Sequence, residues 1–318
     1  MDRKMRLRLA MGACLLIFCL QSGVLNLAAA ALSQNEVLSM LLFLQTGRVV
    51  RPPEPAPTTP EIPAETAPPP TIAPTKPPDR PIFSTDERMD VQYFCDYRPN
   101  LNTLLTQKLD WSLRADAPTV LIVHSHATES YSGTEGYRSL DDRENMIAVG
   151  EEIARVLKNC GIRVLHDKTY HDHPDYDSSY SGARSTIRSY LEKYPSIQMV
   201  LDIHRDASDS TSGQLITSAT VGGQKSAQLM MVVGTDAGGN HHPGWRDNLA
   251  LALKLSALLE RENPGICRPI SLRSERFNMD LTAGRLRVEV GAAGNTLSEA
   301  KIAANALAQA ISALADGA

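Results

Sequence analysis

The sequence lacks any excess of basic charge, because its 318 residues carry 32 Lys and Arg against 36 Asp and Glu, a formal net charge of −4. A protein that binds nucleic acid by neutralising phosphates needs a cationic surface, so that class is disfavoured. The sequence also lacks a P-loop, a G-x-G-x-x-G string, a G-x-S-x-G elbow, a collagen period and a heptad period. An apolar content of 42% is nevertheless too high for a wholly disordered chain.

Cysteines are few and form no regularly spaced framework. Of the five, Cys14 and Cys19 lie in an apolar segment near the start, which leaves Cys95, Cys160 and Cys267 in the rest of the chain. An odd trio without tight spacing is neither a disulfide scaffold nor a zinc ribbon. Two alternatives stay open for these three residues, namely one disulfide or three buried thiols.

The first 35 residues have the pattern of a membrane segment. Residues 1–8 contain four basic side chains and one Asp, and residues 9–35 contain no charged side chain. A bilayer core about 30 Å thick is crossed by a helix of ~20 apolar residues, and the cationic flank stays on the cytoplasmic side. We therefore predict an N-terminal membrane anchor and an exported remainder. The alternative is a cleaved signal peptide, for which the small residues at 28–31 offer a cleavage site.

Proline is concentrated in one segment. Thirteen of the 20 prolines lie between Pro52 and Pro81, a composition typical of a semi-rigid, polyproline-like spacer. Fully extended at ~3.1 Å per residue, this segment reaches up to about 90 Å. We expect residues 36–81 to form a disordered stalk that holds a folded domain away from the membrane. The sequence thus divides into an anchor (1–35), a stalk (36–81) and an exported catalytic domain (82–318).

Residues 82–318 alternate between strand and helix patterns. A continuous apolar run at 119–123 is typical of a strand buried on both faces, and residues 145–159 follow with apolar side chains at helical spacing. We predict an α/β fold, a single domain with a mainly parallel sheet flanked by helices. The other expected strands are 162–165, 197–203, 228–233 (with 214–221 considered as its partner) and 285–290, and the other expected helices are 183–194, 245–262 and 297–314.

Polar clusters lie at three of the predicted strands, near the ends where functional residues of such sheets collect. His124 and His126 follow the first strand, His204 lies in a D-I-H-R-D string, and Glu289 lies in the last strand. Two His and one Glu are the ligand set of a catalytic zinc with an open position for water, and a further carboxylate can move the proton of that water. The pattern indicates a metal site, against the alternative of structural histidines. The loop histidines expected to be exposed are His171, His173, His241 and His242.

Glu289 interrupts an apolar strand that should be buried. Alternation places Arg285 and Arg287 on the same face of that strand, so a surface strand with salt bridges is one interpretation. The turn at 291–295 puts Glu289 near a strand end, which favours a functional site. Ser125 lies between two histidines, but without a nucleophile elbow a serine hydrolase is a distant alternative.

Several uncommon strings occur in an order that resembles one known family. They extend over about residues 120–315, nearly the whole expected domain. The strings are HSHATESY (124–131), VGE (149–151), HD (166–167), LDIHRD (201–206), MVVG (231–234), CRPI (267–270), FNMDL (277–281) and VEVG (288–291). They resemble stage II sporulation protein P, a family with a membrane anchor and a variable linker.

The resemblance implies a zinc-dependent peptidoglycan hydrolase, similar to N-acetylmuramoyl-L-alanine amidases and also credited with D,D-endopeptidase activity. It implies a role in engulfment during sporulation, alongside stage II sporulation proteins D and M. It also implies a single-pass membrane protein whose catalytic domain lies outside the cytoplasmic membrane and degrades the cell wall. The alternatives are a catalytically inactive wall-binding module of the same fold, and a zinc hydrolase of another substrate, such as a deacetylase.

Residue by residue, the resemblance implies His126 and His204 as zinc ligands and Glu289 as the catalytic residue. The third zinc ligand has two candidates. Glu129 lies inside the string that identifies the family and is favoured, whereas similarity to the wider amidase fold points to Glu144. Candidates for orienting a ligand from behind are His124, Arg205 and Asp206.

Overall fold

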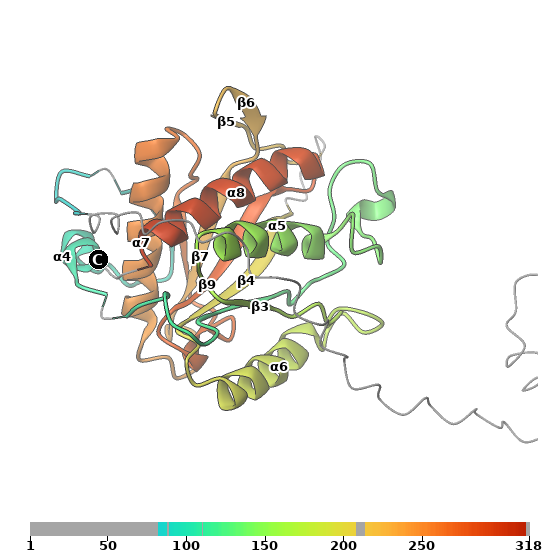
Figure 1. Ribbon diagram of the computed structural model, residues 1–318. Coiled ribbons are helices and arrows are strands. Elements are labelled where there is room, and N and C mark those ends of the chain that lie inside the picture. Colours follow the sequence, from blue (N-terminus) through green and yellow to red (C-terminus); the bar gives the residue numbers. More distant parts are fainter. Residues whose placement is uncertain (1–81, 88, 110, 208–213, 316–318) are drawn as a thin grey trace, which may run out of the picture. The chain divides into compact units, whose positions relative to one another are not determined.

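The structure is a computed structural model that describes residues 82–318 except 88, 110, 208–213 and 316–318 (Figure 1). The predicted anchor at 1–35 and the stalk at 36–81 lie outside the described residues. Within the described residues, no helix is both long and apolar enough to cross a bilayer. The membrane anchor therefore stays a prediction.

Seven strands of the described region form one sheet, in the order β1-β8-β7-β9-β4-β2-β3. Strands β2, β3, β4 and β9 run parallel to one another, as do β1, β8 and β7, and the two groups meet at the antiparallel pair β7–β9. The predicted mainly parallel sheet is confirmed. The strands are β1 (Val91–Phe94), β2 (Val120–Val123), β3 (Val164–His166), β4 (Met199–Asp206), β7 (Leu229–Gly234), β8 (Ile270–Arg273) and β9 (Arg285–Ala292).

Helices cover both faces of the sheet, as expected for this class (Figure 1). Helices α5, α7 and α8 pack on one face, with α8 in contact with both of the others, and α6 packs against β2 on the opposite face. The helices are α4 (Leu101–Thr106), α5 (Met146–Asn159), α6 (Ser179–Lys193), α7 (Trp245–Glu262) and α8 (Leu297–Ala313), with 3-10 turns η1 (Glu135–Tyr137) and η2 (Met279–Leu281).

Strand β2 shows why the sequence forms this layered arrangement. All four of its side chains are fully buried. Val120 and Ile122 belong to the core under α5, α7 and α8, whereas Leu121 and Val123 belong to the smaller core under α6. Because side chains alternate along a strand, a continuous apolar run fills both cores at once.

The pairing considered for 214–221 with 228–233 is wrong. β5 (Ala219–Val221) pairs instead with β6 (Gln224–Ser226), while β7 lies between β8 and β9 in the main sheet. Gly222 and Gly223 adopt φ of +54° and +79°, the positive values that a two-residue hairpin turn needs. They therefore join β5 and β6 directly as a hairpin. β1 and β8 were not predicted from the sequence.

Candidate functional site

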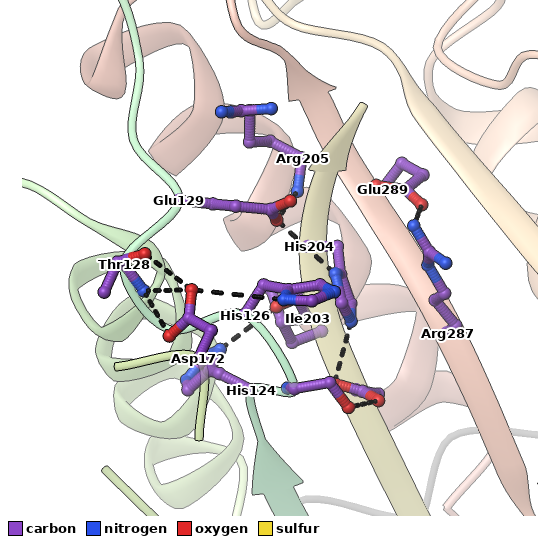
Figure 2. A network of polar contacts seen from close by, with 12 residues as sticks. His124, His126, Thr128, Glu129, Asp172, Ile203, His204, Arg205, Arg287 and Glu289 are labelled. Carbon is purple, nitrogen blue, oxygen red and sulfur yellow. Dashed lines mark hydrogen bonds and ion pairs between the residues drawn. The ribbon is translucent and has the colours of Figure 1, made fainter. Parts of the chain in front are cut away.

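The predicted site residues come together on the parallel strands β2, β4 and β9. His126 lies three residues beyond the end of β2, and His204 and Glu289 are partners in the register of β4 and β9. Figure 2 shows Glu129 reaching toward His204 from the loop after β2. Neighbouring parallel strands present their ends at one edge of the sheet, which explains how residues far apart in sequence meet there.

His204 lies between two carboxylates. Its Nε2 is 3.0 Å from Oδ1 of Asp202, and its Nδ1 is 3.4 Å from Oε2 of Glu129 without a hydrogen bond. Burial and the Arg287 cation favour the neutral ring, but Asp202 and Glu129 outweigh them and raise the pKa of His204 to about 9. Asp202 thus fixes the ring so that Nδ1 points to Glu129.

Glu129 is held as an anion. Burial favours its neutral form, but the charge of His204 close by, together with that of Arg205, lowers its pKa to about 2. The backbone N–H of Arg205 also donates to Oε2 of Glu129 at 3.3 Å. The guanidinium of Arg205 holds the loop that carries Glu129, because it donates to the carbonyl oxygens of Ser130 and Tyr137 at 2.8 and 3.0 Å.

His126 lies beside His204, with ring centroids 5.3 Å apart and planes at 78°. Its Nδ1 is buried without a hydrogen-bond partner among the described residues, and the nearest carboxylate oxygen, of Asp172, is 4.0 Å away. The ring stacks on Tyr176 at 4.6 Å and meets the Tyr180 ring edge-on at 5.3 Å. Burial, with the charge of His204 adding to it, lowers the pKa of His126 to about 4. A neutral imidazole with a free nitrogen is the form that binds metals.

Glu289 presents one free oxygen. Its Oε1 pairs with Nη2 of Arg287 at 2.6 Å, and its Oε2 is buried without a partner among the described residues (Figure 2). Burial raises the pKa of Glu289, although Arg287 and His204 act in the opposite direction. Arg287 is itself fixed, because Nη1 donates to the hydroxyl of Tyr180 at 2.8 Å.

His126, His204 and Glu129 have the donor atoms that Zn²⁺ prefers, two imidazole nitrogens and a carboxylate. Their arrangement also fits a metal, because Nδ1 of both rings is unpartnered and the second nitrogen of His204 contacts a carboxylate, as is usual for a metal-binding His. With a pKa of about 9, His204 would release its Nδ1 proton as a metal binds. In the described part of the chain, however, no three His, Cys, Asp or Glu side chains close on a common point. The three candidate ligands therefore lie near one another without forming a closed cluster.

The alternative ligand Glu144 lies elsewhere. It is exposed, and its carboxylate accepts a hydrogen bond from the hydroxyl of Ser139 at 3.1 Å. Of the two candidates, Glu129 is the one beside His204. The hydroxyl of Ser125 donates to Oδ2 of Asp202 at 2.6 Å and is fully buried, which speaks against a serine nucleophile.

The comparisons with known proteins identify the family. The sequence profile described as Stage II sporulation protein P matches residues 75–312. The chain belongs to this family. The resemblance drawn from the sequence strings is therefore confirmed.

Individual relatives are more distant. Stage II sporulation protein P of Bacillus subtilis (strain 168) is 28% identical over 213 residues, which are 62% of this chain and 51% of that protein. The chain thus spans about half the length of this curated relative. Among solved structures, the CwlD amidase of Clostridioides difficile in complex with the GerS lipoprotein is 10% identical, with 61% of this chain and 96% of that chain covered and a TM-score of 0.41. The N-acetylmuramoyl-L-alanine amidase AmiC2 of Nostoc punctiforme is 11% identical, with coverages of 61% and 94% and a TM-score of 0.37.

Of the three residues predicted to orient a metal ligand, two do not contact a candidate ligand in the structure. His124 contacts no candidate ligand through its side chain: Nδ1 is 3.1 Å from the carbonyl oxygen of Ile203, and Nε2 is 2.8 Å from Nε2 of His166. Asp206 accepts from Arg268 at 2.6 Å. Only Arg205 reaches a ligand candidate, through its backbone N–H.

Sequence reasoning missed Asp172, Tyr176 and Tyr180, which surround His126. The expectation that all four loop histidines are exposed is wrong for His171 and His242, which are 8% and 1% exposed, while the other two are exposed. His171 is buried because its two ring nitrogens lie 3.0 Å from the His124 carbonyl oxygen and 2.9 Å from the Thr186 hydroxyl. The available signal in the sequence was the H-D-H string at 171–173, because Asp172 directly follows His171, whose ring these two contacts hold in the interior.

The cysteine alternatives are resolved for the described residues. Cys95, Cys160 and Cys267 are free thiols, each partly buried. Burial raises the pKa of Cys267 to about 12, so it is not a nucleophile at neutral pH.

Proposed function

We propose that this protein is a sporulation peptidoglycan hydrolase that cleaves the N-acetylmuramoyl-L-alanine amide bond with a zinc-activated water. The observation that carries the proposal is a pair of buried atoms without a hydrogen-bond partner, Nδ1 of His204 and Oε2 of Glu289. Their residues are directly paired on the neighbouring strands β4 and β9. A free imidazole nitrogen suits a metal, and a free buried carboxylate oxygen suits a general base. Membership of the sporulation family supports the same substrate class.

His126, His204 and Glu129 would hold the zinc ion, and Asp202 would keep Nδ1 of His204 available to it. Zinc supplies Lewis-acid activation of a water molecule and of the amide carbonyl. Oε2 of Glu289 accepts the proton of the attacking water, and Arg287 keeps that carboxylate in one orientation through Oε1. As the carbon–nitrogen bond breaks, Glu289 returns the proton to the amine of L-Ala, which leaves the lactyl carboxylate as the other product.

The proposed location and partners follow from the family and from the first 81 residues. A single-pass anchor and a stalk would place the hydrolase at the cell wall outside the cytoplasmic membrane. Action in engulfment, partnership with stage II sporulation proteins D and M, and D,D-endopeptidase activity stay predictions.

The test uses full-length protein in detergent with peptidoglycan as substrate. We expect chelator to abolish hydrolysis and added zinc to restore it, whereas full activity in chelator would contradict the metal. Mass spectrometry of the products distinguishes the substrates, since an amidase releases stem peptides with a free L-Ala amine and a deacetylase releases acetate. A protein that binds zinc and wall but releases nothing would be the inactive binding module.

The Glu289→Gln variant tests the catalytic role directly. We expect kcat to fall by a factor of about 10³ while zinc content stays near that of the wild type, because a general base contributes about 10²–10⁴ to a rate. The matched control is Glu144→Gln, which neutralises an exposed carboxylate at the other candidate position and should leave kcat unchanged. If Glu144→Gln removed zinc from the protein, the assignment of Glu129 as the third ligand would be wrong.

A further inference from the structure

A surface cavity of about 460 Å³ lies against the candidate metal site. Its wall includes Tyr176, whose ring stacks on the ligand candidate His126 at 4.6 Å, and Leu140. These two residues are 49% and 57% exposed and are two of the five large hydrophobic side chains that stand out from the described surface. Apolar side chains gathered at a cavity beside a reactive centre are typical of a binding subsite.

Arg138 is the arginine of this cavity, and it is anchored from below. Its Nη1 donates to the hydroxyl of Thr128 at 2.7 Å and to Oδ2 of Asp172 at 3.1 Å. Its guanidinium lies over the ring of Tyr176, 4.9 Å from the centroid. The side chain is still 42% exposed, and Nε and Nη2 make no hydrogen bond to the described residues. A fixed guanidinium with free N–H groups is a receptor for a carboxylate.

Asp172 does not remove this capacity. It is fully buried, and its carboxylate also accepts hydrogen bonds from the backbone N–H of Thr128 at 3.2 Å and from its hydroxyl at 2.5 Å. These hydrogen bonds also stabilise the carboxylate of Asp172. Within the guanidinium of Arg138, Asp172 contacts only Nη1, so Nε and Nη2 stay available.

The cavity and the ligand candidates share one piece of backbone. Arg138 is the antiparallel bridge partner of Glu129, and the Arg205 guanidinium holds the carbonyl oxygens at both ends of the loop, at Ser130 and Tyr137. A group bound by Arg138 is therefore kept at a fixed position relative to Glu129. Positioning of this kind is what turns binding into rate.

We propose that the cavity formed by Arg138, Leu140 and Tyr176 binds a free carboxylate of the stem peptide, on the amine side of the scissile bond. This inference rests on the proposed function. A peptide offers what the cavity recognises, since its carboxylates match the guanidinium and its small apolar side chains match Leu140 and Tyr176. The glycan of an intact substrate offers only uncharged hydroxyl and amide groups to the free Nε and Nη2 of Arg138.

The test compares four synthetic muramoyl peptides with full-length protein in detergent. The carboxylate of the second stem residue is either free or amidated, and so is the carboxylate at the carboxyl end, so the two sources are distinguished. We expect one of the free carboxylates to raise kcat/KM by about tenfold or more, mainly through KM, as a charge-assisted hydrogen bond does. Arg138→Gln should remove that preference, so that the ratio of kcat/KM between the free and the amidated peptides falls to about one.

Two further variants keep the test decisive. Leu140→Glu places a negative charge at the exposed mouth of the cavity and should weaken the same preference, even if Arg138→Gln folds poorly. Arg268→Gln breaks a different arginine–aspartate ion pair, with Asp206, which is not part of the cavity, and should preserve the preference. Equal kcat/KM for all four peptides, or a preference that survives Arg138→Gln, would overturn the proposal.

Binding separates this proposal from the hydrolase activity. Calorimetry with the Glu289→Gln variant and the free stem peptides measures the carboxylate preference without turnover. If no peptide is cleaved by the wild type but the free carboxylate still binds about tenfold tighter than the amide, the cavity is correct and the proposed reaction is wrong. If cleavage occurs and the binding preference is absent, the reverse holds.

Discussion

At the scale of single residues, unpartnered polar atoms mark the site. Ten buried side-chain atoms in the described region lack a hydrogen-bond partner, and four of them belong to His126, His204, Arg287 and Glu289. Each such atom costs ~1–3 kcal/mol of folding free energy, so their concentration at one edge of the sheet indicates a place kept for a ligand.

Three of these four residues could be predicted from the sequence because each stands in a polar string at a predicted strand. The contacts of Asp172 could not, because they depend on which loops meet, whereas Asp202 and Arg287 each contact a residue two positions away on their own strand. Asp202 points to His204 on its own strand, two residues away, where alternation puts both on one face. Asp172 reaches the site from a loop 44 residues beyond Thr128, which no local pattern reveals.

Arg287→Gln tests how Glu289 is held. The substitution removes the cation that opposes the effect of burial, so the pKa of Glu289 should rise further. Because a general base must be ionised, the acidic limb of the pH–kcat profile should move to higher pH, and kcat at neutral pH should fall by about 10–100-fold. Zinc content, measured by atomic absorption, should not change. An unshifted acidic limb would show that Arg287 does not control Glu289, and Arg273→Gln, at a half-buried arginine paired with Glu275, serves as control.

At the scale of elements, strands with continuous apolar runs were predictable, and strands β1 and β8, which mix polar with apolar side chains, were not. β2 and β4 carry enough consecutive apolar residues to show a buried parallel strand, and α5 begins where Asn145 caps it by accepting from the N–H of Ile147. β1 (VQYF) and β8 (ISLR) are as short as β2, but each has polar side chains among its four residues, so neither shows a continuous apolar run. The reversal of β7 relative to β9 is likewise a property of the sheet as a whole.

Gly150 in α5 is an element-scale position where the site depends on close packing. A Cβ there would lie 2.5 Å from Nε2 of His166 and 2.7 Å from Nε2 of His124, so Gly150→Ala must displace this imidazole pair. Alanine should gain up to ~1 kcal/mol from helix propensity, yet overpacking costs ~1–3 kcal/mol, so we expect a net loss of stability in chemical denaturation. Activity should also fall, because His124 lies two residues before His126.

The double variant Gly150→Ala, His166→Ala is the control for this clash. Removing one of the two crowded rings should recover part of the lost stability, a positive coupling in a double-mutant cycle. Additive effects of the two substitutions would mean that Gly150 matters for another reason. An increase in stability of Gly150→Ala alone would contradict the crowding directly.

At the scale of the whole described region, a buried lysine of α7 contacts both α4 and the chain before β1. Lys254 is 1% exposed, its Nζ donates to the carbonyl oxygen of Leu105 in α4 at 2.7 Å, and it lies 4.2 Å from the centroid of the Phe83 ring. Burial lowers its pKa to about 8, against the partial opposing effect of Glu87. One side chain thus connects three segments that lie far apart in sequence.

This lysine gives the protein a measurable dependence of stability on pH. The unfolded chain keeps Lys254 protonated up to a pKa of about 10.4, whereas the folded chain releases that proton above about 8. Between these values the unfolded state binds more protons, so the contribution of Lys254 to the free energy of unfolding rises with pH. Below pH 8 Lys254 is protonated in both the folded and the unfolded state, so the free-energy cost of burying its charge does not change with pH.

Lys254→Met should therefore flatten the increase in the free energy of unfolding between pH 8 and 10.5, measured by urea denaturation at several pH values. Lys158→Met, at an exposed lysine of α5, should not. Parallel pH dependences for Lys254→Met and the wild type would show that Lys254 stays charged in the folded protein throughout this range.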